Sequence, residues 1–286
     1  QWSPDGRRLA FVRKVDDHPQ LAVIEVDGGE AEVVTSFPLG VAGRPAWSPD
    51  GSRIAVVGVD WTDEWADLDD EERARRPRRI TRRDYRADGI GWTHDRRRHV
   101  YVIDLGGETE PRRVTDGEAN ELAPIWSPDG AAISFLTDLS DRPGYQPGAD
   151  IVTAPAEGGT ARPVAPRGSW HALAYDADGV LHAIGNPGLD FPELPGLWRL
   201  EEEPRPVVAD AGRGLFSLSG GPDRFGFDGG RAYVPFVDSG RVAIAAVDPT
   251  GEIELVVDER AIVTGFDRRA GTTAYTLSSM EHPARL

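Results

Sequence analysis

Short runs of apolar residues, each bounded by turn residues, follow one another along most of the chain. Runs at 7–12, 53–59 and 131–136 each follow a Ser-Pro-Asp-Gly segment, in which proline fixes φ and Asp-Gly accepts a tight reversal. Runs of this length favour buried strands. A third run, such as 21–27, precedes a glycine-rich turn, and a shorter run such as 32–35 follows it. The pattern therefore predicts a repeating unit of four short antiparallel strands.

The repeat is marked by an identical pentapeptide, Trp-Ser-Pro-Asp-Gly, which begins at Trp2, Trp47 and Trp126. Weaker copies retain the aromatic residue and a following glycine, and they begin at Tyr175, Phe225 and Phe266. The first interval is 45 residues and the second is 79, so an insertion separates the second and third copies. Four-stranded units with a period of about 40 to 50 residues are typical of β-propellers.

The sequence thus predicts an all-β fold, a β-propeller of four-stranded antiparallel blades. Six blade registers are visible, and we expect them to form part of a seven-bladed ring. A pair of two-sheet sandwiches also contains many short strands, but that architecture does not predict a repeated pentapeptide. The repeated tryptophans are expected to pack between blades. Since both ends of the sequence fall within a blade, we expect residues 1–286 to be a propeller domain that is incomplete at both ends of a longer protein.

The insertion covers residues 60–98, and it joins the second and third strands of the second blade. Within it, 61–76 has acidic residues early and arginines late, and Pro77 follows. This charge order complements the dipole of a helix, so we expect a short helix with Thr62 or Asp63 as its cap. The Ser-Pro-Asp-Gly turns join first and second strands, so they are expected at the opposite end of the sheets.

A basic cluster follows the expected helix, with aromatic residues among its arginines. It contains Arg78, Arg79, Arg82, Arg83, Tyr85, Arg86 and Trp92. In one interpretation Arg82, Arg83, Tyr85 and Arg86 face a substrate, because the guanidinium fork suits a peptide carboxylate or carbonyl. In the other interpretation, which is the more common one for runs of charged residues, the arginines form salt bridges with the acidic residues at 67–72 or with another domain.

Composition and charge exclude several classes of partner. The 48 acidic and 32 basic residues give a net charge of −16, which opposes binding to nucleic acid. No apolar stretch approaches the ~20 residues of a membrane span, so no membrane partner is expected. Cysteine is absent, and the six histidines lack metal-binding spacing. We therefore predict no metal and no cofactor. The absence of cysteine says little about the compartment, and the expected location is the cytoplasm.

These motifs resemble the N-terminal propeller of the prolyl oligopeptidase family of serine peptidases. The resemblance is strongest to the acylaminoacyl-peptidase and dipeptidyl-aminopeptidase-like branch. It rests on the Trp-Ser-Pro-Asp-Gly repeats, the Gly-Gly-Glu turns and the arginine-rich insertion, which ends in Asp-Tyr-Arg-Ala-Asp-Gly-Ile-Gly-Trp at 84–92 and leads into the strand 98–104. Propellers of the TolB type share the repeats, whereas the insertion favours the peptidase branch.

The resemblance implies an α/β-hydrolase domain after residue 286, with a Gly-x-Ser-x-Gly elbow and a Ser, Asp, His triad. The serine cluster at 217–221 lacks the glycine and strand-turn-helix context of such an elbow, so no catalytic residue is expected in this chain. The dipeptidyl-peptidase members of the family hold a substrate N-terminus with paired acids, but the surroundings of Glu71 and Glu72 do not match that motif.

The leading functional hypothesis is therefore a noncatalytic propeller that gates a serine peptidase acting on short peptides. Its expected partners are the peptide and the hydrolase domain of the same chain. A second hypothesis is a TolB-like module for protein interaction without hydrolysis. A third, a propeller enzyme with an axial metal, lacks support because no acidic motif recurs on the innermost strands.

Overall fold

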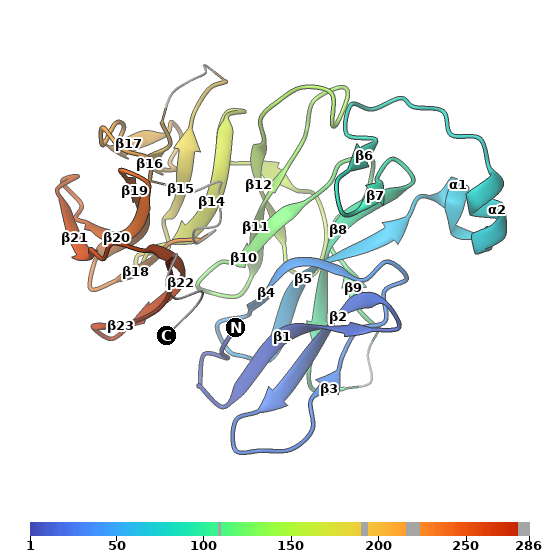
Figure 1. Ribbon diagram of the computed structural model, residues 1–286, viewed down its shortest axis with the longest axis horizontal. Helices are drawn as coiled ribbons and strands as arrows, with labels where there is room; N and C mark the ends of the chain where they lie inside the picture. The colour runs from blue at the N-terminus through green and yellow to red at the C-terminus, as the bar shows by residue number, and fades with distance from the viewer. Residues whose placement is uncertain (108–109, 190–193, 216–223, 280–286) are drawn as a thin grey trace. The chain divides into compact units, whose positions relative to one another are not determined.

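The computed structural model describes residues 1–107, 110–189, 194–215 and 224–279. The chain forms two compact units, Gln1–Pro163 and Val164–Leu286, which are described separately below. The strands labelled in Figure 1 lie in short sheets with almost entirely antiparallel pairing. In the described part of the chain, no helix has the length and apolar character needed to cross a membrane.

The first unit contains three propeller-type sheets, each formed by consecutive strands. The first sheet comprises β1 (Arg8–Val15), β2 (His18–Glu25) and β3 (Glu32–Val33). The second sheet comprises β4 (Val41–Trp47), β5 (Arg53–Trp61), β8 (Arg96–Asp104) and β9 (Arg112–Arg113). The third sheet comprises β10 (Leu122–Trp126), β11 (Ala132–Thr137), β12 (Asp150–Pro155) and β13 (Arg162–Pro163).

The second unit contains two further sheets. One comprises β14 (Ser169–Tyr175), β15 (Leu181–Asn186), β16 (Gly196–Arg199) and β17 (Arg205–Val208). The other comprises β18 (Gly226–Asp228), β19 (Arg231–Asp238), β20 (Arg241–Val247), β21 (Ile253–Val257), β22 (Ile262–Arg269) and β23 (Thr272–Ser278). The described residues thus form five sheets of the propeller type.

The sixth register predicted from the sequence does not form a separate sheet in the described residues. Its two strands, β22 and β23, make an antiparallel hairpin, and β22 pairs in parallel with β20 through Val242 and Ile262. A two-stranded hairpin is marginally stable by itself. Phe266 and Leu277 of the hairpin are buried against Ile244, so the hairpin gains its apolar contacts from β20 of the same sheet.

Both faces of the second sheet are buried, which explains its nearly continuous apolar strands. Ile54 and Tyr101 pack toward the first sheet, in a cluster with Leu21 of β2. The neighbouring residues Ala55 and Val102 belong to a different cluster, which includes Trp126 and Phe135 of the third sheet. Because successive side chains in a strand point to opposite faces, an apolar pair such as Ile54–Ala55 supplies both interfaces.

The Ser-Pro-Asp-Gly segments form the same hydrogen-bonded turn in all three copies. In the second copy the Ser48 hydroxyl donates to Asp50 Oδ1 at 2.6 Å, and it accepts from the backbone N–H of Arg53 at 2.9 Å. The backbone N–H of Ser52 donates to the same carboxylate. Gly51 has a φ of +72°, which glycine adopts without steric cost. These four residue types are therefore conformational requirements of the turn between first and second strands.

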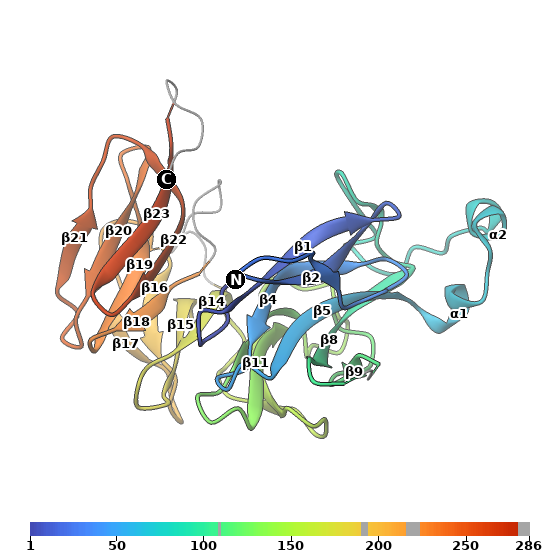
Figure 2. The ribbon, with the colours of Figure 1, turned by 90° about the horizontal axis from the view of Figure 1, so that it is seen from below.

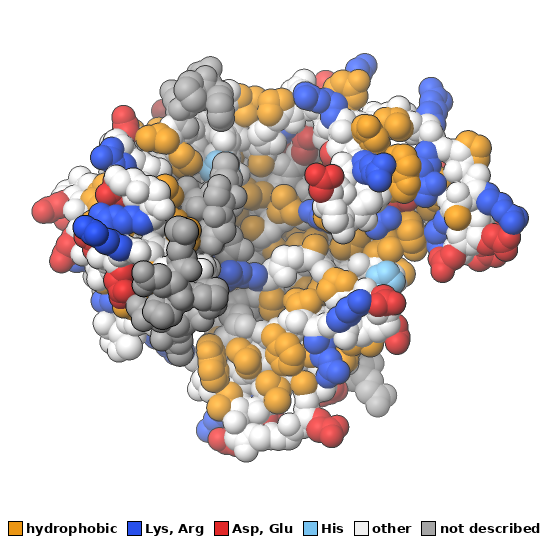
Figure 3. Space-filling view, in the orientation of Figure 1, with side chains coloured by type: hydrophobic (Ala, Val, Ile, Leu, Met, Phe, Trp, Pro, Cys, Tyr) orange, Lys and Arg blue, Asp and Glu red, His pale blue; other side chains and the backbone are white. Residues whose placement is uncertain are grey.

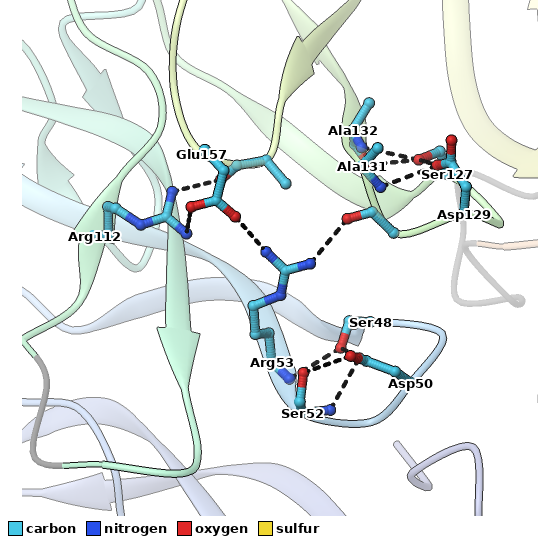
Figure 4. Close-up of polar contacts among 12 residues, drawn as sticks. Ser48, Asp50, Ser52, Arg53, Arg112, Ser127, Asp129, Ala131, Ala132 and Glu157 are labelled. Atoms are coloured by element: carbon cyan, nitrogen blue, oxygen red, sulfur yellow. Dashed lines mark hydrogen bonds and ion pairs between the residues drawn. The ribbon is translucent and has the colours of Figure 1, made fainter.

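A tryptophan and an arginine from successive repeats join neighbouring sheets. The Trp126 indole donates to the carbonyl of Ala46 at 2.9 Å, just as Trp47 donates to Gln1. The Arg53 guanidinium lies 4.7 Å from the Trp126 ring centre, and it donates to the carbonyl of Gly130 at 2.9 Å. Figure 4 shows Arg53 reaching from its own strand toward the next turn. Each such Trp–Arg joint combines a hydrogen bond with a cation–π contact.

Arg53 also belongs to an ion-pair chain that crosses from the second sheet to the third. Its Nη1 lies 2.7 Å from Glu157 Oε1, and Arg112 Nη2 lies 3.2 Å from Glu157 Oε2. Figure 4 shows the Glu157 carboxylate between the two guanidinium groups. The Glu157 side chain is 74% exposed, so we assign most of the joint's strength to the buried tryptophan and the backbone contacts.

Trp2, which the sequence predicts to pack between blades, is 51% exposed. Trp47 and Trp126 are each only 7% exposed, as predicted. Trp2 lies among the first described residues, where its backbone makes a single bridge to Leu9. The Trp2 ring does not pack between two of the described sheets.

In the first two sheets, a buried polar residue lies one position before the apolar run of the third strand. It is Gln20 in the first sheet and His99 in the second. Thr35 Oγ1 accepts from the backbone N–H of Leu21, and Thr115 Oγ1 accepts in the same way from Val100. The side chain of Gln20 donates to the Phe37 carbonyl at 2.7 Å. These bonds hold the chain where it leaves the fourth strand for the next sheet.

The aspartate carboxylates of these turns should make the free energy of unfolding depend on pH in the acidic range. Hydrogen bonds from the Ser48 hydroxyl, and then from Ser52, lower the pKa of Asp50 from 3.8 to about 2. A depressed carboxyl pKa contributes stability above pH 3.8 that is lost as the pH falls toward 2. We expect the difference in unfolding free energy between the native protein and Asp50→Asn to be larger at pH 5 than at pH 2.5, as measured by urea denaturation. An equal difference at both pH values would contradict this expectation.

Candidate functional site: an arginine-rich surface on the insertion

The insertion leaves the second sheet between β5 and β8. Pairing of these strands continues to Trp61 and Arg96, so the part outside the sheet is shorter than the predicted 60–98 and spans 62–95. It contains α1 (Asp63–Ala66), α2 (Asp70–Arg75) and the hairpin of β6 (Arg86–Ala87) and β7 (Gly91–Trp92). Figure 2 shows the two helices beyond the end of β5. The predicted helical insertion in the second blade is confirmed.

The single helix expected over 61–76 is divided in two. Asp69 has extended backbone angles, and its side chain accepts from the backbone N–H of Glu72, whose carboxylate in turn accepts from the backbone N–H of Asp69. This capping box starts a new helix. Thr62 occupies the cap position of α1, as predicted, but its side chain makes no capping hydrogen bond.

The acidic residues of the helices pair mainly with arginines of the same segment. Arg73 lies 3.1 Å from Asp70, Arg75 lies 2.5 Å from Glu71, and Arg76 pairs with Glu64. Among the described residues, Arg82, Arg83 and Arg86 make no ion pair with the acidic residues at 67–72. Pairing with another domain, the other part of the salt-bridge interpretation, stays a prediction. Glu71 and Glu72 both have partners within the helical segment.

Three tryptophans in or next to the insertion are stacked with five arginines. Arg73 and Arg96 contact the Trp61 ring, Arg76 and Arg78 contact Trp65, and Arg78 and Arg86 contact Trp92, with distances of 4.4 to 5.5 Å to the ring centres. Such contacts contribute about 0.5–1 kcal/mol each when exposed and more when desolvated. The stack gives a short segment with little regular structure a defined shape.

Asp95 is a buried carboxylate that pairs with two arginines of this stack. The side chain is 1% exposed, and it lies 2.9 Å from Arg96 Nε and 3.5 Å from Arg78 Nη2. Its neighbour His94 packs edge-on against Trp65 and Trp92. Burial lowers the pKa of His94, which favours the neutral imidazole in this arginine-rich surrounding.

Arg82, the first of the predicted substrate-facing residues, is held in the protein. Its side chain is 9% exposed, it donates to the carbonyl of Glu118 at 2.7 Å, and it lies 3.2 Å from Asp84. The carboxylate of Glu118 lies 2.5 Å from Arg97 Nη2. The hydrogen bond from Arg97 lowers the pKa of Glu118. Arg82 thus ties the insertion to the connection between β9 and β10.

Arg83, Tyr85 and Arg86, the other predicted residues, lie on the surface. Tyr85 is 37% exposed and contacts Trp92, with 6.2 Å between ring centres. Arg86 pairs with Trp92 across the hairpin and stacks on its ring. Figure 3 shows arginine and apolar side chains side by side over β6, β7 and the helices.

A second loop, which sequence reasoning missed, lies beside the insertion. Residues 138–149 join β11 to β12, the second and third strands of the next sheet. Gly144, with a φ of +76°, approaches Asp84 so closely that a Cβ would come within 2.8 Å of Cγ. The sequence did contain a signal for this neighbourhood. Loop 138–149 and the insertion both join the second and third strands of their sheets, and corresponding connections emerge at the same end of neighbouring sheets.

Other candidate chemistry is limited in the described residues. The serine cluster at 217–221 lies outside them. Two histidines, His99 and His182, are buried in strands. Among residues 1–107, 110–189, 194–215 and 224–279, no group of three His, Asp or Glu side chains is placed to hold a metal ion.

The repeated short antiparallel sheets define a β-propeller, and its fold resembles the propeller domains of acylaminoacyl and prolyl peptidases. An acylaminoacyl peptidase in complex with Z-Gly-Gly-Phe-chloromethyl ketone matches with a TM-score of 0.75 and 20% identity, over 99% of this chain and 42% of that chain. At this identity the match establishes the fold.

Two curated relatives match about half of the sequence. The uncharacterized peptidase YuxL of Bacillus subtilis is 33% identical over 146 residues, which cover 49% of this chain and 22% of YuxL. The Tol-Pal system protein TolB of Bordetella pertussis is 30% identical over 157 residues, which cover 50% of this chain and 35% of TolB. The aligned regions thus span about a third of these relatives or less. No family model matches the sequence.

Proposed function

We propose that this chain is the noncatalytic propeller domain of a serine peptidase and restricts access of peptides to the catalytic site. The observation that carries the proposal is the structural likeness to an acylaminoacyl peptidase over 99% of the chain. The sequence match to the peptidase YuxL supports it independently. The physical basis is exclusion: a cap with a narrow opening admits short, unfolded chains and keeps folded proteins from the nucleophile.

The proposed partners are a peptide substrate and an α/β-hydrolase domain encoded after residue 286. We propose that the propeller of the complete protein is a seven-bladed ring in the cytoplasm, and that the hydrolase domain sits at the end of the sheets that carries the insertion. In that arrangement the segment with Arg82, Arg83, Tyr85 and Arg86 borders the cleft. Arg82 serves as a positioning residue because its guanidinium is held by Glu118 and Asp84.

A serine-directed probe tests this proposal. The complete protein that contains this chain should react with a fluorophosphonate, and changing the serine of its Gly-x-Ser-x-Gly elbow to alanine should abolish the labelling. Gel fluorescence of the labelled protein is the measurement. Absence of labelling in a folded complete protein would overturn the peptidase assignment.

A TolB-like interaction module is the second candidate. The observation that favours it is the 30% identity to TolB over 157 residues. Such a module needs no elbow serine, so the probe experiment separates the two candidates. The arginine-rich insertion between β5 and β8 favours the peptidase, because an extra segment at one end of the sheets suits a domain that borders a cleft.

A further inference from the structure

Two arginines of the insertion have no partner among the residues that the structure describes. Arg79 and Arg83 are exposed, and neither makes a hydrogen bond, an ion pair or a ring contact in that part of the chain. Arg86, also exposed, stacks on Trp92. By contrast, Arg82 and Arg97 are both bound to Glu118. In a chain with a net charge of −16, the two exposed guanidinium groups of Arg79 and Arg83 are available to an outside anion.

Exposed apolar side chains lie among these arginines. Ile80 and Ile90 are each 51% exposed, and Tyr85 is 37% exposed. The neighbouring loop adds Leu139 and Tyr145, at 54% and 44%. Aromatic, aliphatic and arginine side chains together are the composition of binding surfaces, where they bury area and supply directional hydrogen bonds. We call this set of residues, from segment 79–92 and loop 138–149, the arginine surface.

Hydrogen bonds within the hairpin and to the rest of the protein fix the backbone of the arginine surface. Arg86 and Trp92 are paired in the β6–β7 hairpin, and the backbone N–H of Thr93 donates to the Tyr85 carbonyl at 2.9 Å. Arg82, beside Arg83 in the sequence, is fixed by the Glu118 carbonyl. A surface whose backbone is fixed before binding loses less conformational entropy when a ligand binds.

We propose that the arginine surface binds acidic peptides, with Arg83 and Arg86 contacting a Glu or Asp carboxylate and Tyr85 and Ile90 contacting its apolar neighbours. This inference rests on the proposed function and names the substrate class: peptides that carry an acidic residue between apolar ones. Guanidinium groups suit carboxylates because two parallel N–H donors match two oxygens. A nucleic acid is disfavoured, since the remaining negative charge of the chain repels a polyanion.

Direct binding to the complete protein tests the proposal. The probe is a fluorescein-labelled peptide with two glutamates between leucines, compared with the same peptide carrying glutamines, and anisotropy is the measurement. The glutamate peptide should bind at least tenfold more tightly, and its affinity should fall as NaCl is raised. The double variant Arg83→Gln/Arg86→Gln should remove this preference, whereas Arg7→Gln, an exposed arginine beside the first Ser-Pro-Asp-Gly turn, should keep it.

A charge-reversed variant guards against an effect of misfolding. Arg83→Glu/Arg86→Glu, with an unchanged melting temperature, should prefer a peptide with lysines in place of the glutamates. Equal binding of glutamate and glutamine peptides overturns the proposal, and so does tighter binding of single-stranded DNA than of the glutamate peptide. A preference for glutamate without fluorophosphonate labelling supports the surface while overturning the peptidase, and labelling without the preference overturns the surface alone.

Discussion

Replacing Trp126 with alanine is expected to lower the free energy of unfolding by about 3–5 kcal/mol. The indole is 7% exposed and packs in the cluster between the second and third sheets. Its loss leaves a cavity, leaves the Ala46 carbonyl without its donor and removes the ring beneath Arg53. Since domains of ordinary size have a total stability of about 5–15 kcal/mol, this one change removes a large share.

Two matched variants separate the contributions to this effect. Trp126→Phe keeps most of the buried ring but not the N–H donor, and should cost about 1 kcal/mol. Trp2→Ala changes the same pentapeptide at a position that is 51% exposed, where surface substitutions cost about 0.5 kcal/mol or less. Urea denaturation followed by circular dichroism gives all three values. Equal losses for Trp2→Ala and Trp126→Ala would refute the role of the Trp–Arg joint.

A second large effect is expected at Glu121, which lies directly before β10. Its carboxylate is 3% exposed and lies 3.1 Å from His99 Nδ1. It also accepts from the hydroxyls of Thr115 and Thr137 at 3.0 and 3.3 Å. Removing this acceptor leaves the buried His99 and Thr137 and the half-buried Thr115 without their partner, so Glu121→Ala should cost about 3–5 kcal/mol.

The isosteric and exposed controls test whether burial causes this loss. Glu121→Gln retains a carbonyl acceptor and the side-chain volume, so it should cost less than half as much as the alanine variant. Glu71 is 67% exposed and pairs with Arg75, so Glu71→Ala should lower the free energy of unfolding by only about 0.5 kcal/mol. Thermal unfolding at neutral pH measures all three. A Glu121→Ala loss no larger than that of Glu71→Ala would rule out a buried network.

The strands and turns were predictable because their determinants are local. A Ser-Pro-Asp-Gly turn contains its own hydrogen bonds, from Ser48 to Asp50 and from Arg53 to Ser48, so the pentapeptide specifies its conformation wherever it occurs. The strand that follows must bury both faces, which requires a continuous apolar run. These requirements fall within a few residues, and the repeat multiplies the evidence for them.

The features that were not predicted depend on distant partners. The charge order over 61–76 indicates a helix, but the reciprocal bonds of Asp69 and Glu72 divide it. Arg82 pairs with the Glu118 backbone, 36 residues away, which no local pattern reveals. Loop 138–149 joins the surface only because neighbouring sheets direct equivalent connections to the same end. The sequence analysis selected residues 82–86 as the candidate site, whereas their division into held and exposed arginines required the three-dimensional contacts.

The Trp–Arg joint makes the repeats interchangeable in evolution. The second copy carries both halves of the joint: the Trp47 indole contacts the copy before it, and Arg53, six positions later, contacts the copy after it. A tandem duplication of such a unit therefore adds both the tryptophan and the arginine that the next joint needs, and it leaves no indole N–H without an acceptor. The third copy has Ala132 at the arginine position, and the first compact unit ends with that sheet, at Pro163. A copy that followed the third would find no arginine at this position, so the series of Trp–Arg joints ends with the third sheet.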